Sequence, residues 1–346
     1  MVGEAVPNHW RKVPGFKELK VLEIPEASSR VAMLETGQAE IVNVSLKDVA
    51  RMTGLGMTAV RNGAYAISTI WPAGNFWQEK NPTTGVSIFP RPGFKPDKDH
   101  PWIGDPRDPE QMERARKVRW AMSMAIDREA INKAILGGLG VPAYVPTLSS
   151  NDGLYQPKWK MDFDPAKAKA LLTEAGYPAG FKFTFFIPPD SGIPPEIGEA
   201  VAAMWANIGL ATEIERTSYA VRRPTEVKRE IDIPWLFSSG PDTPVLDRVN
   251  VPAWAFDQAG WNPGFEAQEM WDWFRGIATE ANEAKRKQLM TDRLEFFYKW
   301  QVGIAVLEVP TLVVYNPKKV RTGWQSHFEI VTTAGFNRLE YAEPVS

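Results

Sequence analysis

Apolar and polar positions in the middle of the chain follow two alternating periods, one typical of strands and one typical of helices. Short apolar runs predict three strands, at residues 181–187, 211–216 and 231–237. Amphipathic stretches between them predict two helices, at residues 195–208 and 219–229. Pro224 is expected in the first turn of the second helix, where its missing N–H does no harm. Strands that alternate with helices predict a βαβαβ unit with parallel strands, and therefore an α/β fold.

The flanking regions show the same mixture of periods. Further strands are predicted at 19–24, 40–44, 64–70, 304–308 and 311–315. Further helices are predicted at 27–36, 109–136, 266–281 and 283–301, and one begins at Asp164-Pro165 and ends at Gly176. Proline recurs throughout residues 72–110, which predicts a long ordered loop or a crossing between domains.

Composition narrows the class of protein. The net charge is −2 and the basic clusters are short, so nucleic-acid binding is not expected. The chain has no cysteine, which excludes disulfides, zinc–thiolate sites and thiol nucleophiles. No apolar run approaches the roughly 18 residues of a membrane span. Residues 1–20 also have no apolar signal-peptide core.

Motifs of known enzyme chemistry are missing from the sequence. His9, His100 and His327 are isolated, and there is no HExxH, GxGxxG, P-loop or G-x-S-x-G pattern. We therefore assign no catalytic residue and no metal ligand, and we expect no cofactor. A Ser-His-Asp triad or a pair of catalytic carboxylates built from distant residues stays open as an alternative.

Aromatic and polar residues gather after the third strand of the βαβαβ unit. Ligands of parallel α/β sheets bind outside the carboxyl ends of the strands, here at 188–192, 217–218 and 238–242. Flat rings beside hydroxyls, an amide and a carboxylate suit a small polar ligand. Core packing is the alternative role for each tryptophan. The candidate ligand-binding residues are Trp235, Ser238, Ser239, Asp242, Trp254, Trp261 and Asn262.

Three motifs resemble one known family. Residues 24–30 (IPEASSR), 118–131 (VRWAMSMAIDREAI) and 164–178 (DPAKAKALLTEAGYP) are similar, in this order, to motifs of family 5 bacterial extracellular solute-binding proteins. Members of that family serve ABC importers of oligopeptides, dipeptides or nickel. The resemblance implies that Asp127 and Arg128 cap and brace a helix and do not touch ligand.

The resemblance also implies an architecture and a function. We expect a periplasmic-binding-protein-like bilobal fold with a partial lobe I (1–75), a proline-rich crossing (76–108), a complete lobe II (109–308) and a return to lobe I (309–346). The expected role is capture of a peptide or other small polar solute between the lobes, without catalysis, for a membrane permease. A monomer in the periplasm or outside the cell is expected.

Two departures from the family pattern shape these expectations. Family members are longer and begin with a signal peptide, so this chain resembles their later part, and weak or absent ligand binding is expected. Peptide binders often carry an acid three positions after the loop tryptophan, where this chain has Ser238 and reaches Asp242 later. Peptide specificity therefore stays open. A carbohydrate-binding or carbohydrate-active protein that uses the tryptophans as platforms is the alternative function.

Overall fold

The chain folds into two compact units. The computed structural model describes residues 2–24, 26–239, 262–321 and 339–345. One unit comprises Met1–Ala66 with Val309–Ser346, and the other comprises Ile67–Glu308. Residues 76–108, expected as a crossing between lobes, lie inside the second unit. Local bonds hold them there, since Asn75 Oδ1 accepts from the N–H of Gly104 at 3.0 Å.

The first unit combines short strands with two helices. Its elements are β1 (Val2–Glu4), β2 (Glu18–Lys20), α1 (Ala27–Glu35), β3 (Ile41–Asn43), α2 (Leu46–Gly54), the start of β4 (Thr58–Pro72), the end of β11 (Ile304–Tyr315) and the 3₁₀ turn η4 (Leu339–Tyr341). β1 and β2 form an antiparallel ribbon. β3 pairs antiparallel with the end of β11.

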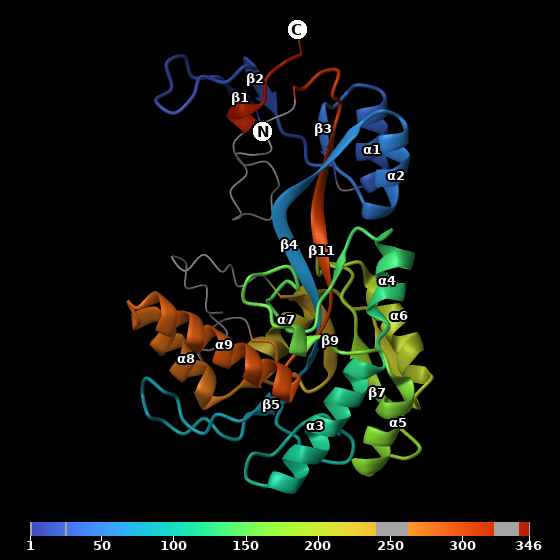
Figure 1. Ribbon diagram of the computed structural model, residues 1–346, viewed down its shortest axis with the longest axis vertical. Helices are drawn as coiled ribbons and strands as arrows, with labels where there is room; N and C mark the ends of the chain where they lie inside the picture. The colour runs from blue at the N-terminus through green and yellow to red at the C-terminus, as the bar shows by residue number, and fades with distance from the viewer. Residues whose placement is uncertain (1, 25, 240–261, 322–338, 346) are drawn as a thin grey trace. The chain divides into compact units, whose positions relative to one another are not determined.

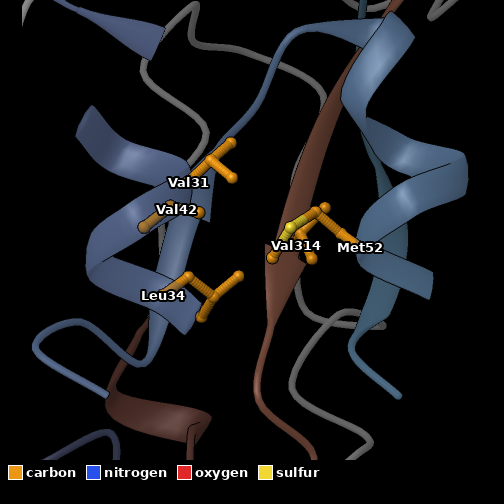
Figure 2. Close-up of a cluster of buried hydrophobic side chains, with 5 residues drawn as sticks. All are labelled: Val31, Leu34, Val42, Met52 and Val314. Carbon is orange, nitrogen blue, oxygen red and sulfur yellow. The ribbon is translucent and has the colours of Figure 1, made fainter. Parts of the chain in front are cut away.

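A small apolar core joins these elements of the first unit. Val31 and Leu34 are three residues apart on α1 and therefore share one face of that helix. They meet Met52 of α2, Val42 of β3 and Val314 of β11, as Figure 2 shows. Burial of each such side chain contributes about 1.5–3 kcal/mol to folding. The helix predicted at 27–36 is confirmed, and its apolar spacing is what positions this core.

The second unit holds most of the regular structure. Its elements are the rest of β4 and β11, β5 (Asn75–Phe76), α3 (Pro109–Met124), α4 (Arg128–Ile135), β6 (Val141–Pro142), η1 (Pro157–Trp159), α5 (Pro165–Glu174), β7 (Phe181–Phe186), α6 (Pro195–Ala206), β8 (Leu210–Glu215), α7 (Tyr219–Val227), β9 (Pro234–Ser239), β10 (Phe265–Glu266), α8 (Gln268–Thr279) and α9 (Glu283–Trp300).

The sheet of the second unit confirms the predicted βαβαβ unit. Its strand order is β11-β4-β9-β7-β8. β7 pairs parallel with both β8 and β9, whereas β4 pairs antiparallel with β9. Helices lie on both faces of this sheet (Figure 1). On one face Trp205 of α6 contacts Phe185 of β7, and on the other Tyr219 of α7 stacks on Trp235 of β9.

The capping signals read from the sequence are present in the structure. Asp164 accepts a hydrogen bond from the N–H of Lys167 at 2.8 Å, and Pro165 occupies the first position of α5. Gly176 follows the helix at φ +94°, a left-handed conformation that glycine adopts without strain. The motif at 164–178 is therefore structural.

The single helix predicted at 109–136 is wrong. α3 ends at Met124 and α4 begins at Arg128. The break arises because the Asp127 carboxylate accepts from the N–H of Ala130 at 2.9 Å and so starts a new helix. The apolar periodicity continues across residues 125–127, so the sequence pattern does not reveal the break between the two helices.

Other predicted boundaries also differ; for example, β4 is longer than the strand predicted at 64–70. Pro224 lies inside α7 and not in its first turn. Proline has no N–H, so the carbonyl of Ala220, one helical turn earlier, receives no hydrogen bond from it. Ala220 is exposed, so water can bind this carbonyl instead. The two predicted strands at 304–315 are one strand, because Pro310 is compatible with extended backbone. The strand predicted at 19–24 is only Glu18–Lys20.

Arg128 braces the start of α4 from inside the second unit. Its side chain is 4% exposed and donates to the carbonyls of Ala143 (2.9 Å), Ala305 (2.8 Å) and Ser123 (3.1 Å). Burial lowers the pKa of Arg128 to about 10. This value is still well above 7, so the guanidinium is charged at pH 7. The resemblance assigned this arginine a bracing role, and the contacts agree.

We predict that Arg128→Ala lowers the free energy of unfolding by at least about 2 kcal/mol, because three buried carbonyls lose a charged donor. Urea denaturation of both proteins measures the difference. Arg114→Ala is the control; Arg114 is an exposed residue of α3 whose 3.8 Å ion pair with Glu110 is worth little, so a change within about 0.5 kcal/mol is expected. Equal losses in the two variants would contradict a bracing role.

Candidate functional site

β7, β8 and β9 run in the same direction, and the carboxyl ends of β7 and β8 lie beside the start of β9, because Phe186 pairs with Glu215 and with Trp235. This part of the sheet in the second unit is called here the strand-end edge. The turn after β7 is bonded to the start of α7, since Asp190 Oδ1 accepts from the N–H of Tyr219 at 2.8 Å. Gly192 closes that turn at φ +74°. Two of the three predicted loops therefore meet here, as expected for parallel strands.

Trp235 lies in the core beneath this edge. Its side chain is 1% exposed. Its ring is parallel to that of Tyr219, with centroids 6.0 Å apart, and nearly parallel to that of Phe186 at 6.2 Å. The indole N–H donates to the carbonyl of Pro263 at 3.0 Å. Trp235 thus supports the edge, in line with the core-packing alternative for single tryptophans.

The two serines lie on β9 itself, because the strand extends two residues beyond the predicted end. Ser238 is half-buried and pairs with Ser68 of β4. Ser239 is buried, with its Oγ 2.8 Å from Thr69 Oγ1, and it accepts from the N–H of Thr147 at 3.2 Å. Thr147 has a φ of +68°, a strained backbone for a β-branched residue. These hydroxyls lie at the end of β9.

Asn262 organises the chain where it enters β10. It is fully buried, and its Oδ1 accepts from the N–H groups of Gly264 (2.7 Å) and Phe265 (3.0 Å). Gly264 has a φ of +90°, and a Cβ there would lie 2.2 Å from that of Ala73. Asn262 therefore shapes a tight turn. Asp242, Trp254 and Trp261 lie outside the described residues.

Sequence reasoning missed a buried carboxylate, Glu226 of α7. It is 1% exposed. Its Oε2 accepts from the Tyr219 hydroxyl at 2.5 Å, and its Oε1 accepts from the N–H of Asn262 at 2.5 Å. Burial raises the pKa of Glu226, and the bonds from Tyr219 and Asn262 partly oppose that rise. The helical pattern marks position 226 as inward-facing, but a glutamate there signals nothing by itself.

A second buried carboxylate, Glu266 of β10, is held by two arginines. Glu266 accepts from Arg229 Nε at 2.7 Å and from Arg91 Nε at 2.8 Å. Arg229 has a left-handed φ of +58°, and its carbonyl accepts from the N–H of Gly93 at 2.7 Å. A buried charge needs such partners, because removal from water is costly. The ion triad ties residues 91–93, the end of α7 and β10 together.

Other ligand chemistry is limited in the described ranges. Within residues 2–24, 26–239, 262–321 and 339–345, no three His, Cys, Asp or Glu side chains lie where they could hold a metal ion. In the same part of the chain no helix has the length and apolar character to cross a bilayer. Among the candidate binding residues that the structure describes, Ser238 is half-buried, whereas Trp235, Ser239 and Asn262 are buried.

Comparison with known proteins identifies the family. Residues 1–262 match bacterial extracellular solute-binding proteins, family 5, middle region. The chain belongs to this family. Heme-binding protein A of Haemophilus influenzae is 28% identical over 215 residues, which are 59% of this chain and 32% of that protein. Glutathione-binding protein GsiB of Escherichia coli K12 is 32% identical over 114 residues, or 32% of this chain and 22% of that protein.

Solved structures of similar fold support a periplasmic-binding-protein-like α/β architecture. The periplasmic binding protein DppA of Helicobacter pylori, solved with the peptide STSA, has a TM-score of 0.69 at 17% identity, over 99% of this chain and 60% of that one. The substrate-binding protein CtaP of Listeria monocytogenes has a TM-score of 0.73 at 15% identity, over 99% and 63%. The chain spans about a third or less of the curated relatives and about 60% of these solved chains.

We predict that Glu226→Gln changes how stability depends on pH. A raised folded-state pKa means that Glu226 contributes stability below its unfolded pKa of about 4.3, and that this contribution is lost as pH rises through the folded value. The free energy of unfolding of wild type should therefore fall, relative to that of Glu226→Gln, as pH rises from about 4.5 to 8.

Urea denaturation of both proteins across this pH range measures the effect. Glu110→Gln is the control, since the Glu110 side chain is 90% exposed, and its difference from wild type should stay small throughout. A difference between Glu226→Gln and wild type that does not change with pH would contradict the assignment.

Proposed function

We propose that this chain captures a peptide or other small polar solute as the substrate-binding component of an ABC importer, and that a membrane permease receives the ligand. The observation that carries the proposal is membership of the solute-binding family over residues 1–262. Relatives named for heme and glutathione, and a neighbour solved with a peptide, support a small ligand. Capture forms no covalent bond, and the protein works as a monomer in the periplasm or outside the cell.

The proposed ligand-binding stretch runs from the end of β9 to the start of β10. Ser238 is half-buried at the end of the strand and offers a hydroxyl. Asp242, Trp254 and Trp261 supply a carboxylate and two aromatic rings, the groups that hold a polar organic molecule. Trp235 and Asn262 precede and follow this stretch in the sequence, and both are buried. Their buried hydrogen bonds favour a supporting role for both.

The alternative function, a carbohydrate-binding or carbohydrate-active protein, is not supported. A glycosidase needs two carboxyl groups about 5–9.5 Å apart beside the bound sugar. The buried carboxylates near the strand-end edge are engaged, since Glu226 binds Tyr219 and Asn262 while Glu266 binds two arginines. The two relatives described above are named for heme and glutathione.

Ligand capture is tested directly on the 346-residue chain. Calorimetry of the purified protein with glutathione and with the dipeptide Met-Leu should show saturable binding weaker than about 10 μM. No saturable binding of either probe would contradict the proposal.

Two substitutions identify the chemistry of the ligand. If Asp242 pairs with a ligand ammonium group, Asp242→Asn should weaken binding by about 1.5–3 kcal/mol, the usual size for a hydrogen bond to a charged group. If the ligand is neutral, Asp242→Asn should change affinity little, whereas Trp261→Ala should weaken it clearly. Calorimetry and melting temperatures are compared for both variants. A lower melting temperature with unchanged affinity in both would contradict their ligand-binding role.

A further inference from the structure

Four contacts form a closed circuit beneath the strand-end edge. The Trp235 indole N–H donates to the carbonyl of Pro263. The next residue back, Asn262, donates its N–H to Glu226. Glu226 accepts from the Tyr219 hydroxyl, and the Tyr219 ring stacks on Trp235 with an angle of 2° between the planes. The contacts return to their starting residue, so the position of each member is fixed from two sides.

Glu226 is the member that joins the two halves of this circuit. One carboxylate oxygen faces α7, through Tyr219, and the other faces the segment that leads into β10, through Asn262. At 1% exposure its carboxylate cannot touch a solute. An apolar residue at this position would leave a hydroxyl and an amide buried without these acceptors, which is unfavourable for each group.

The charges around Glu226 suit this connecting role. Arg223 of α7 donates to the Tyr219 hydroxyl at 3.0 Å, and Arg223 and Arg229 both favour the ionised carboxylate by Coulomb attraction. Arg229 is itself bound to Glu266 of β10. The groups that donate directly to the Glu226 carboxylate are the Tyr219 hydroxyl and the N–H of Asn262. One of these donors comes from α7 and the other from the segment that leads into β10.

We infer that Glu226 is a positioning residue of the strand-end edge, which holds Tyr219 and Asn262 at a fixed separation so that the Trp235 ring and residues 262–264 keep one geometry. The inference rests on the proposed function only where it concerns ligand affinity. A purely local structural role for Glu226 makes a different prediction, because loss of one of its bonds would then leave the distant Trp235–Pro263 bond unchanged.

The hydrogen-exchange rates of two indole N–H groups, measured by NMR without any ligand, distinguish a positioning role of Glu226 from a purely local one. Trp235 reports the far side of the circuit. Trp205 is the internal reference, because its indole N–H donates to Met122 at 2.8 Å in the same unit but outside the circuit. Tyr219→Phe keeps the ring and removes the hydroxyl, so it should raise the Trp235-to-Trp205 ratio of exchange rates about tenfold, the factor for roughly 1.4 kcal/mol.

Two further variants complete the test. Glu226→Gln retains an acceptor for Asn262 and a donor toward the Tyr219 oxygen, so its ratio should stay within about threefold of wild type. Ile131→Val, a buried change on α4 outside the circuit, should lower overall stability with the ratio unchanged. A ratio that is the same in Tyr219→Phe, Ile131→Val and wild type would overturn the inference.

Affinity for glutathione or Met-Leu, whichever binds wild type, extends the test to function. Tyr219→Phe should weaken binding in parallel with its rise in the exchange ratio. A raised ratio with unchanged affinity would overturn the link between the circuit and the ligand. If wild type binds neither probe, the proposed function fails, and the exchange ratio still decides whether Glu226 positions the edge.

Discussion

Polar groups buried around β9 must find their partners within the protein, and this constraint organises the second unit. Ser239, Glu226 and Asn262 are each at most 3% exposed, so water cannot serve them. Each is bonded to a segment distant in sequence: Ser239 to Thr69, and Glu226 to Asn262. An unmade bond at such a site costs more than a made bond contributes. The segments that carry these partners must therefore pack against one another in the folded protein.

The same constraint explains how the unit treats buried charge. Arg128 is charged and buried without a carboxylate, and it relies on carbonyl oxygens of three separate segments. Glu266 is handled in the opposite way, with Arg91 and Arg229 as direct counter-ions. Both arrangements fix the backbone that supplies the partners. The first braces the start of α4, and the second closes the turn between α7 and β9 against β10.

A rigid base of this kind is what a solute-binding site requires. Affinity for a small ligand depends on groups already held in the bound geometry, because ordering them on binding would oppose association. In this chain most of the residues proposed to touch ligand come from the stretch between β9 and β10, whereas Trp235, Glu226 and Asn262 are buried. Supporting and contacting residues are thus separate sets. Substitution of a supporting residue such as Tyr219 tests this division.

The sequence by itself determined the βαβαβ order, the caps of α5 and the family, because periodicity, capping and motif order are local properties of the chain. It also named Trp235, Ser238, Ser239 and Asn262 as neighbours of one edge. Tertiary structure alone decided that three of these four side chains are buried and that Glu226 joins α7 to Asn262. Glu226 and Asn262 are 36 residues apart in sequence. Such a bond forms only when two elements pack, and no local pattern records which partner a buried polar group will meet.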